Sequence, residues 1–169
     1  MLTPTPYITK MFEYIAADVQ SVTGIQLHYE HGHPAEIDET LTAWSKTPDN
    51  SKVKYPMLAL FQDFDEEVTT NKSLMCEVKL ELIIATMTLP NYNADQRMIN
   101  TFVPILYPLY YQFILSLQQS GYFAGYPPYP HTKTDRLFWG KNKQAAFGDY
   151  VDAIHIQNLQ LSVKKFNCT

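Results

Sequence analysis

The fold is decided by the stretch Lys54–Leu89, KYPMLALFQDFDEEVTTNKSLMCEVKLELIIATMTL, which holds two apolar runs separated by a short polar segment. The first run, Lys54–Gln62, and the second, Ser73–Leu89, both have the composition of strands. Apolar and polar residues alternate in the second run, as in a half-buried strand. The residues expected on its buried face are Leu74, Cys76, Val78, Leu80 and Leu82. Because the connection between the runs is short, the two strands should form an antiparallel hairpin.

The expected hairpin is long for a domain of this size. About sixteen residues at ~3.3 Å each would extend roughly 50 Å, whereas a compact domain of this length has a diameter near 40 Å, from a radius of gyration of about 15 Å. The hairpin is therefore predicted to project beyond its own domain. A projecting strand edge usually needs a partner, which favours oligomerisation.

An acidic cluster follows the first strand, near the predicted tip of the hairpin. Its members are Asp63, Asp65, Glu66 and Glu67. They lack the Asp-x-Asp-x-Asp-Gly pattern and the distal glutamate of a calcium loop. The cluster is interpreted as a charged tip that faces solvent or a neighbouring protein.

Helical and strand patterns flank this hairpin on the N-terminal side. Apolar residues recur every three or four positions from Thr5 to Gly24, which predicts an amphipathic helix that ends at the glycine. The alternation in Ile25–Glu30 predicts a strand. Pro34 could open a short helix. Its apolar face would carry Ile37, Leu41 and Trp44.

On the C-terminal side, Asn93 is expected to cap a long helix over Ala94–Gln119, with a kink or break at Pro104 and Pro108. A Tyr/Pro-rich connection over about 121–149 follows, and connections of this length are usually functional. The last strand alternates strongly. Its apolar phase shifts at Gln157 and Asn158, which predicts a β-bulge.

These patterns predict one α+β domain over 1–169, an antiparallel sheet of four or more strands with helices on one face. Hydrophobic residues make up 46% of the chain, as in a globular protein. A net charge of −4 argues against binding a phosphate backbone. There is no pattern of a signal peptide, and the most apolar run, 102–117, is too short to span a bilayer, so a soluble protein with no membrane contact is expected.

Two groups of residues could carry chemistry. His28, His31 and His33 with Glu30 and Glu36 could bind zinc or nickel, but their spacing lacks a helical HExxH frame, and a surface or turn role is favoured. For nucleophilic catalysis, Cys76 lies in mid-strand and there is neither a G-x-S-x-G elbow nor a phosphate-binding glycine loop. No enzymatic activity, metal or cofactor is expected.

The segment DRLFWG, Asp135–Gly140, is rich in residue types found at interface hot spots. Arg136, Phe138 and Trp139 are the candidates. Three interpretations are open. Trp139 plugs the core under the long connection, or the segment contacts another protein. In the third, bases of a single-stranded nucleic acid stack on the aromatic rings, and the nearby Lys141 and Lys143 help to hold the strand.

Several segments together resemble the tail terminator (tail completion) and neck proteins of tailed bacteriophages, especially versions from phages of Bacteroidetes-like hosts. They are GHPAEI, KYPMLALFQDFDEE, LIIATMT, FVPILYPLYYQFI and FWG…DAIHIQNLQLSV, and the likeness runs from about Thr5 to Lys165 in the same order of elements. The 121–149 connection matches no family motif.

The resemblance implies a non-enzymatic virion protein that forms a homo-oligomeric ring, commonly a hexamer, after assembly in the host cytoplasm. Such a ring caps the tail tube protein, stops tube growth and joins the tail to the head–tail connector or stopper protein. Genome DNA passes through the lumen without specific binding. Asp63, Asp65, Glu66 and Glu67 would then face a neighbouring ring or the lumen.

Three alternatives to the terminator stay open. An adjacent neck component such as a stopper or adaptor is also structural, although stoppers are more often small β-barrels. A metal-binding enzyme would use the histidines and Glu36. A host small-molecule-binding module would be monomeric or dimeric, with a closed apolar pocket.

Overall fold

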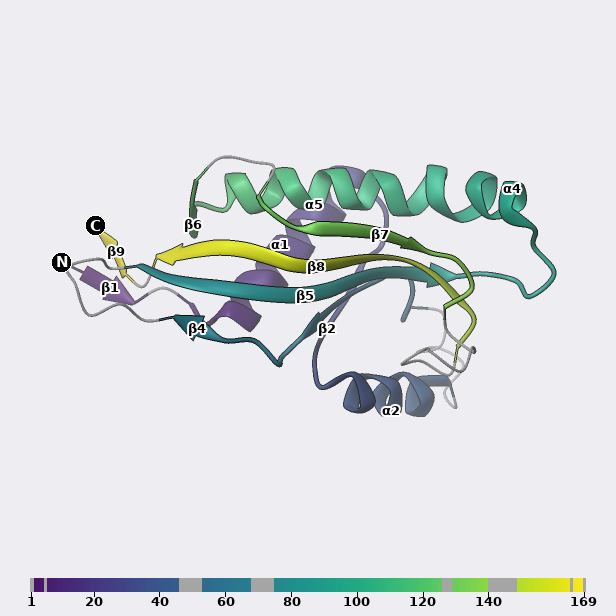
Figure 1. Ribbon diagram of the computed structural model, residues 1–169, viewed down its shortest axis with the longest axis horizontal. Helices are drawn as coiled ribbons and strands as arrows, with labels where there is room; N and C mark the ends of the chain where they lie inside the picture. The colour runs from purple at the N-terminus through teal and green to yellow at the C-terminus, as the bar shows by residue number, and fades with distance from the viewer. Residues whose placement is uncertain are drawn as a thin grey trace.

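The computed structural model describes residues 2–4, 6–45, 53–67, 75–125, 129–139, 149–164 and 166–168. Within these ranges seven strands form one curled mixed sheet, and the fold is α+β (Figure 1). The strand order is β2-β3-β5-β8-β6, with β4 beside β5 and β7 beside β8. The terminal strands, β1 (Leu2–Pro4) and β9 (Phe166–Cys168), pair with each other in a separate two-stranded sheet.

The centre of the sheet is an antiparallel pair of long strands, β5 (Met75–Met87) and β8 (Val151–Lys164). Their pairing runs from Met75 opposite Lys164 to Met87 opposite Val151. Within the described residues, the second strand of the expected hairpin thus has an intramolecular partner from Met75 to Met87.

The other side of β5 pairs with β3 (Met57–Phe61) and β4 (Glu66–Glu67), both antiparallel. The predicted antiparallel pairing of the two apolar runs is confirmed. The residues of the predicted tip, 68–74, including Leu74, lie outside the described ranges.

The pairing of β2 (His28–Gly32) with β3 is parallel, so the prediction of a purely antiparallel sheet is wrong. Parallel neighbours need a crossover connection, commonly a helix. The helix predicted at Pro34 is present as α2 (Pro34–Ser45), and it supplies this crossover. The side chains of Leu41 and Trp44 lie outside the described part of the chain.

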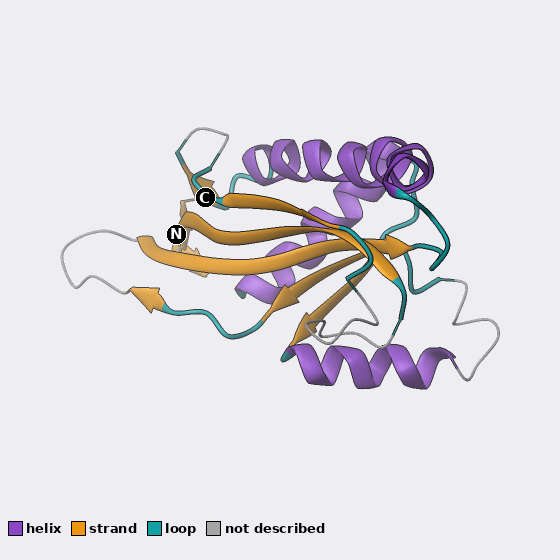
Figure 2. Ribbon diagram, turned by 45° about the vertical axis from the view of Figure 1, so that its right-hand side comes forward, coloured by secondary structure: helices purple, strands orange, loops and turns teal. Residues whose placement is uncertain are grey.

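Helices cover both faces of the sheet, which corrects the prediction of helices on one face (Figure 2). All five residues of β3 are buried, and a strand that is apolar on both sides needs cover on both sides. On the second face, Ile37 of α2 packs against apolar residues of β3, β5 and β8. These are Met57, Ala59, Phe61, Ile83, Ala85, Val151 and Ala153.

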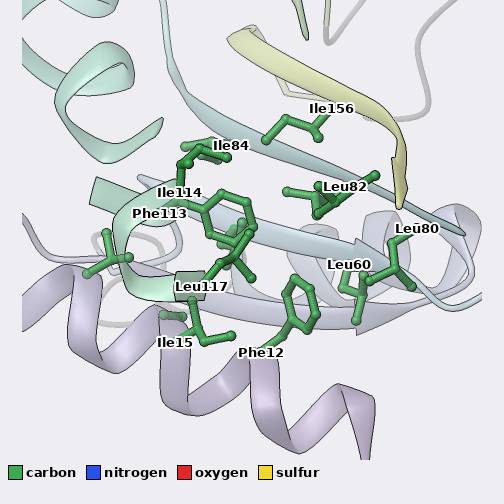
Figure 3. Close-up of a cluster of buried hydrophobic side chains, with 14 of the residues drawn as sticks. Phe12, Ile15, Leu60, Leu80, Leu82, Ile84, Phe113, Ile114, Leu117 and Ile156 are labelled. Carbon is green, nitrogen blue, oxygen red and sulfur yellow. The ribbon is translucent and has the colours of Figure 1, made fainter. Parts of the chain in front are cut away.

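The main core lies between the first face of the sheet and two helices, α1 (Ile8–Thr23) and α5 (Tyr107–Gln119). Figure 3 shows Phe12 of α1 and Phe113 of α5 pointing toward the sheet, with their ring centroids 6.1 Å apart. The strands contribute Leu60, Leu80, Leu82, Ile84 and Ile156. Gly24 ends α1 in the left-handed conformation, as predicted from the sequence.

The predicted long helix is confirmed as three continuous segments, α4 (Ala94–Arg97), the π-helix η1 (Met98–Leu106) and α5. Asn93 and Gln96 cap its start reciprocally. Pro104 lies inside η1, where the Tyr107 N–H bonds to the Phe102 carbonyl five residues back. The missing proline donor is thus accommodated by a change of hydrogen-bond pattern rather than by a break.

Taken together, Ala94–Gln119 is long and apolar enough to cross a membrane by length and composition, but buried residues of this helix, including Phe102 and Phe113, form part of the main core.

The connection 121–149 contains two short strands that pair with β8: β6 (Phe123–Ala124) and β7 (Thr132–Arg136). Residues 126–128 and 140–148 lie outside the described ranges. The predicted bulge in β8 is confirmed. Leu80 pairs with Leu159 and Leu82 with Ile156, so two residues of β8 face one residue of β5, and Asn158 has a φ of 54°.

Candidate functional site

The predicted acidic cluster is exposed on the connection from β3 to β4 and on β4 itself. Asp65 and Glu67 line an open hollow of about 220 Å³ together with Glu77, whose strand position the sequence had placed on the polar side. Val78, Lys79 and Gln160 complete the lining. Asp63 and Glu66 are exposed beside it and are not part of the lining. The structure therefore brings two of the four predicted carboxylates to one surface, with a third carboxylate from β5.

Two of these carboxylates belong to residues that lie directly opposite each other on neighbouring strands, Glu67 on β4 and Glu77 on β5. Like charges opposite each other on antiparallel strands are destabilising. At a separation of about 5 Å in water the repulsion is roughly 0.8 kcal/mol. The Ser162 hydroxyl donates a hydrogen bond to Glu77, and Lys79 is the cation in the lining. The hollow is thus a surface to which a cationic partner would bind favourably.

The second predicted group is Arg136, Phe138 and Trp139, and its two aromatic residues contact different parts of the structure. The indole of Trp139 lies against the imidazole of His155, with centroids 4.9 Å apart, and packs on the apolar cluster of the second sheet face. The Arg136 guanidinium lies 5.6 Å from the Trp139 ring. These contacts agree with the core interpretation of Trp139, while an interface role for Arg136 and Trp139 stays a prediction.

His155 connects this group to a carboxylate. Its Nε2 lies 2.5 Å from Glu81 Oε1, and its Nδ1 lies 3.4 Å from Nη2 of Arg136. The Nε2 atom of His155 thus faces a carboxylate and its Nδ1 atom faces a guanidinium. Within the part of the chain that is described, Nε of Arg136 is buried without a hydrogen-bond partner.

Phe138 has a left-handed backbone, with a φ of 52°, and different ring partners from Trp139. Its ring stacks on Tyr150 with centroids 5.0 Å apart and an interplanar angle of 12°, and the Arg97 guanidinium lies 5.0 Å from the centroid of the Phe138 ring. The Phe138 N–H donates to Asp152 Oδ1 at 2.8 Å. The segment is therefore anchored to a buried polar network.

Asp152 is the centre of that network and is fully buried. It accepts hydrogen bonds from Arg97 Nη1 at 3.0 Å and from the Thr101 hydroxyl at 2.8 Å. Arg97 also donates to the Thr88 hydroxyl and to the carbonyls of Leu89 and Tyr92. Sequence reasoning missed this network, although an aspartate at an inward position of an alternating strand was an available signal.

A polar contact between α5 and β7 holds the start of the segment in place. The Tyr107 hydroxyl donates to Asp135 Oδ2 at 2.6 Å, and this bond raises the pKa of Tyr107 to about 12. Lys133 Nζ lies 2.6 Å from Asp135 Oδ1 and lies over the rings of Tyr107 and Tyr110. Burial raises the pKa of Tyr110, whose hydroxyl lies 2.7 Å from Nε2 of His131.

The three histidines considered for a metal site have separate partners. His28 Nε2 contacts Glu30 at 2.8 Å, His31 Nδ1 contacts Gln62 at 2.9 Å, and His33 Nδ1 accepts from the Ala35 N–H at 3.2 Å. Among the described residues no group of three or more metal-binding side chains converges.

A second hollow, of about 170 Å³, lies between α1 and α5. Its lining includes Asp18 and Ser116, and the serine hydroxyl lies 2.5 Å from Asp18 Oδ2. The lining holds no imidazole to act as a base for the serine. Both hollows are smaller than the roughly 300–1,000 Å³ of usual ligand pockets.

Replacing Trp139 by alanine is expected to lower the free energy of unfolding by about 2 kcal/mol, because a partly buried indole on an apolar cluster is lost. Chemical denaturation of the monomer measures this. If stability is unchanged while self-association is weakened, the indole instead belongs to a subunit interface.

Comparison of the chain with protein-family models and with curated protein sequences finds no match.

Proposed function

We propose that the protein is a structural subunit of a tailed-bacteriophage virion, a tail terminator. It forms a homo-oligomeric ring, commonly a hexamer, at the head-proximal end of the tail. The ring ends growth of the tail tube and joins the tail to the head connector, and the genome passes through its lumen without specific binding. The residue pattern of the sequence and the α+β fold both support this proposal.

The observation that carries the proposal is the acidic hollow at the β4–β5 end of the sheet. Asp65, Glu67 and Glu77 are exposed there, and two of them repel each other in the isolated subunit. Within the subunit Ser162 and Lys79 offset part of this negative charge, and a neighbouring ring that presents lysine or arginine would relieve the rest. We place the contact with the tail tube or the connector at this end of the sheet.

The buried polar groups Asp152, Arg97 and His155 have structural roles in this proposal. Asp152 and Arg97 bind each other and neighbouring segments within the core. His155 bonds to Glu81. Each of these groups thus holds elements of the fold together, which is what a rigid structural subunit requires.

Replacing Glu67 by lysine should weaken docking to tail tubes of the phage that encodes the protein, while it slightly stabilises the subunit. The substitution converts the Glu67–Glu77 repulsion into an attraction, worth about 0.2–1 kcal/mol in stability. It also places a positive charge in the proposed contact. Tube co-sedimentation and chemical denaturation measure the two effects.

Glu39→Lys is the matched control, because Glu39 is exposed on α2 and the change in net charge is the same. It should leave docking unchanged. Equal docking by the Glu67 and Glu39 variants, or a large loss of stability in Glu67→Lys, would contradict the proposed role of the acidic hollow.

A further inference from the structure

The outer side of the long helix carries an exposed apolar stripe. Its members are Ile99, Val103, Tyr111 and Leu115, with exposed fractions of 72%, 57%, 64% and 46%. Ile99 and Val103, and likewise Tyr111 and Leu115, are four positions apart, which makes the members of each pair neighbours on the helix surface. The opposite side of the same helix packs into the main core through residues such as Phe102 and Phe113. The helix is therefore apolar on two sides, and the described part of the subunit covers one of them.

The stripe lies in a long uncharged part of the chain. Residues 98–132 contain no aspartate, glutamate, lysine or arginine. An exposed helix of a monomer normally carries charged side chains on its solvent side. The depletion of charge with enrichment of tyrosine and aliphatic residues is instead the composition of the centre of a protein–protein interface.

The size of the stripe suits an interface between subunits. Its four residues are each about half exposed or more, and contiguous apolar patches of a few hundred Å² mark interaction sites. A standard interface buries about 800 Å² on each partner. The stripe would thus supply the apolar centre of such an interface, and the polar residues around it would supply the rim.

We propose that this stripe is the surface by which two copies of the chain bind each other. An uncharged face can meet an identical face, or another part of an identical subunit, without like-charge repulsion. A lipid bilayer suits it less well. Helices that lie on membranes carry lysine and arginine on their polar side, whereas this helix has no cation after Arg97 and the chain has a net charge of −4.

Self-association through the stripe stands on exposure and charge alone. Closure of the assembly into a tail ring rests on the proposed function. Self-association and tail docking are tested by different variants. Glu67→Lys tests the acidic hollow, and it should lose docking while self-association stays intact. A stripe variant tests the helix, and it should lose self-association.

The test is the mass of the purified protein by native mass spectrometry and light scattering, at about 100 μM, where an interface of micromolar affinity is occupied. The double variant Val103→Glu, Tyr111→Glu places two charges in the stripe. We expect the wild-type chain to be oligomeric and the double variant to be monomeric, with an unchanged thermal unfolding midpoint because both positions are exposed.

Tyr7→Glu is the matched control, since Tyr7 is a tyrosine on the start of α1 with 87% of its surface exposed. It should associate like the wild type. A monomeric wild-type chain at this concentration, or a double variant that associates as strongly as the wild type, overturns the proposal. Co-sedimentation with vesicles of phosphatidylcholine and phosphatidylglycerol, lost in the double variant, would overturn it in favour of a membrane.

Discussion

Replacing Asp152 by alanine is expected to lower the free energy of unfolding by about 3–5 kcal/mol, the usual cost of breaking a buried ion pair. The substitution leaves the Arg97 guanidinium in the core without its anion. It also removes the acceptor of the Phe138 N–H and one of the two acceptors near the Thr101 hydroxyl, the other being the Arg97 carbonyl. Because these donors come from η1 and from the segment after β7, the loss affects several elements at once.

Denaturant unfolding followed by circular dichroism measures this change. Lys10→Ala is a control, because Lys10 forms an exposed ion pair with Glu13 and exposed pairs contribute little. Its midpoint should match the wild type. The double variant Arg97→Met, Asp152→Ala should lose less stability than the sum of the single variants. A wild-type midpoint for Asp152→Ala would show that the network does not hold these elements together.

Replacing Phe113 by alanine is also expected to cost about 3–5 kcal/mol, as for other fully buried phenylalanines. The ring lies between α5 and the sheet and contacts Phe12 of α1 (Figure 3). Its removal leaves a cavity at the junction of two helices and the sheet. Thermal or denaturant unfolding of the variant gives the loss directly.

Tyr111→Ala is the control for this substitution, because Tyr111 is two positions away on the same helix and is exposed. Its effect on the unfolding of the monomer should stay within about 0.5 kcal/mol. The same variant should weaken self-association. If Tyr111→Ala destabilised the monomer as much as Phe113→Ala, the outer side of the helix would be part of the core.

Local patterns predicted most of the elements. The spacing of apolar residues gave α1 and the long helix, and the alternation in the second run gave β5 with Cys76, Val78, Leu80 and Leu82 buried. The phase change at Gln157 and Asn158 gave the bulge. Each of these signals lies within one segment, where side-chain period alone decides the structure.

The errors concern relations between segments. The parallel pairing of β2 with β3 depends on α2 crossing the sheet, and periodicity does not say which face a crossover helix covers. The unbroken apolar sequence of β3, MLALF, was the available signal that both faces of this strand are covered. The strand β7 was missed because its polar sequence, TKTDR, resembles that of a loop, and its pairing with β8 is non-local.

The candidate site was predicted in part for the same reason. The exposure of Asp63, Asp65, Glu66 and Glu67 follows from local charge, but the approach of Glu77 to Glu67 depends on strand register. The segment with Arg136, Phe138 and Trp139 was recognised by composition. Its division between His155 and the Asp152 network depends on the left-handed backbone at Phe138, which no local pattern in the segment indicated. The positions of Lys141 and Lys143 lie outside the described residues.

Electron microscopy of the purified protein mixed with growing tail tubes tests the central claim most directly, with the mass of the free protein measured on the same sample. The account predicts a ring of about six subunits on one end of each tube, and tubes that stop growing when the protein is added. Tubes that continue to grow, with no added density at either end, would contradict the tail-terminator function.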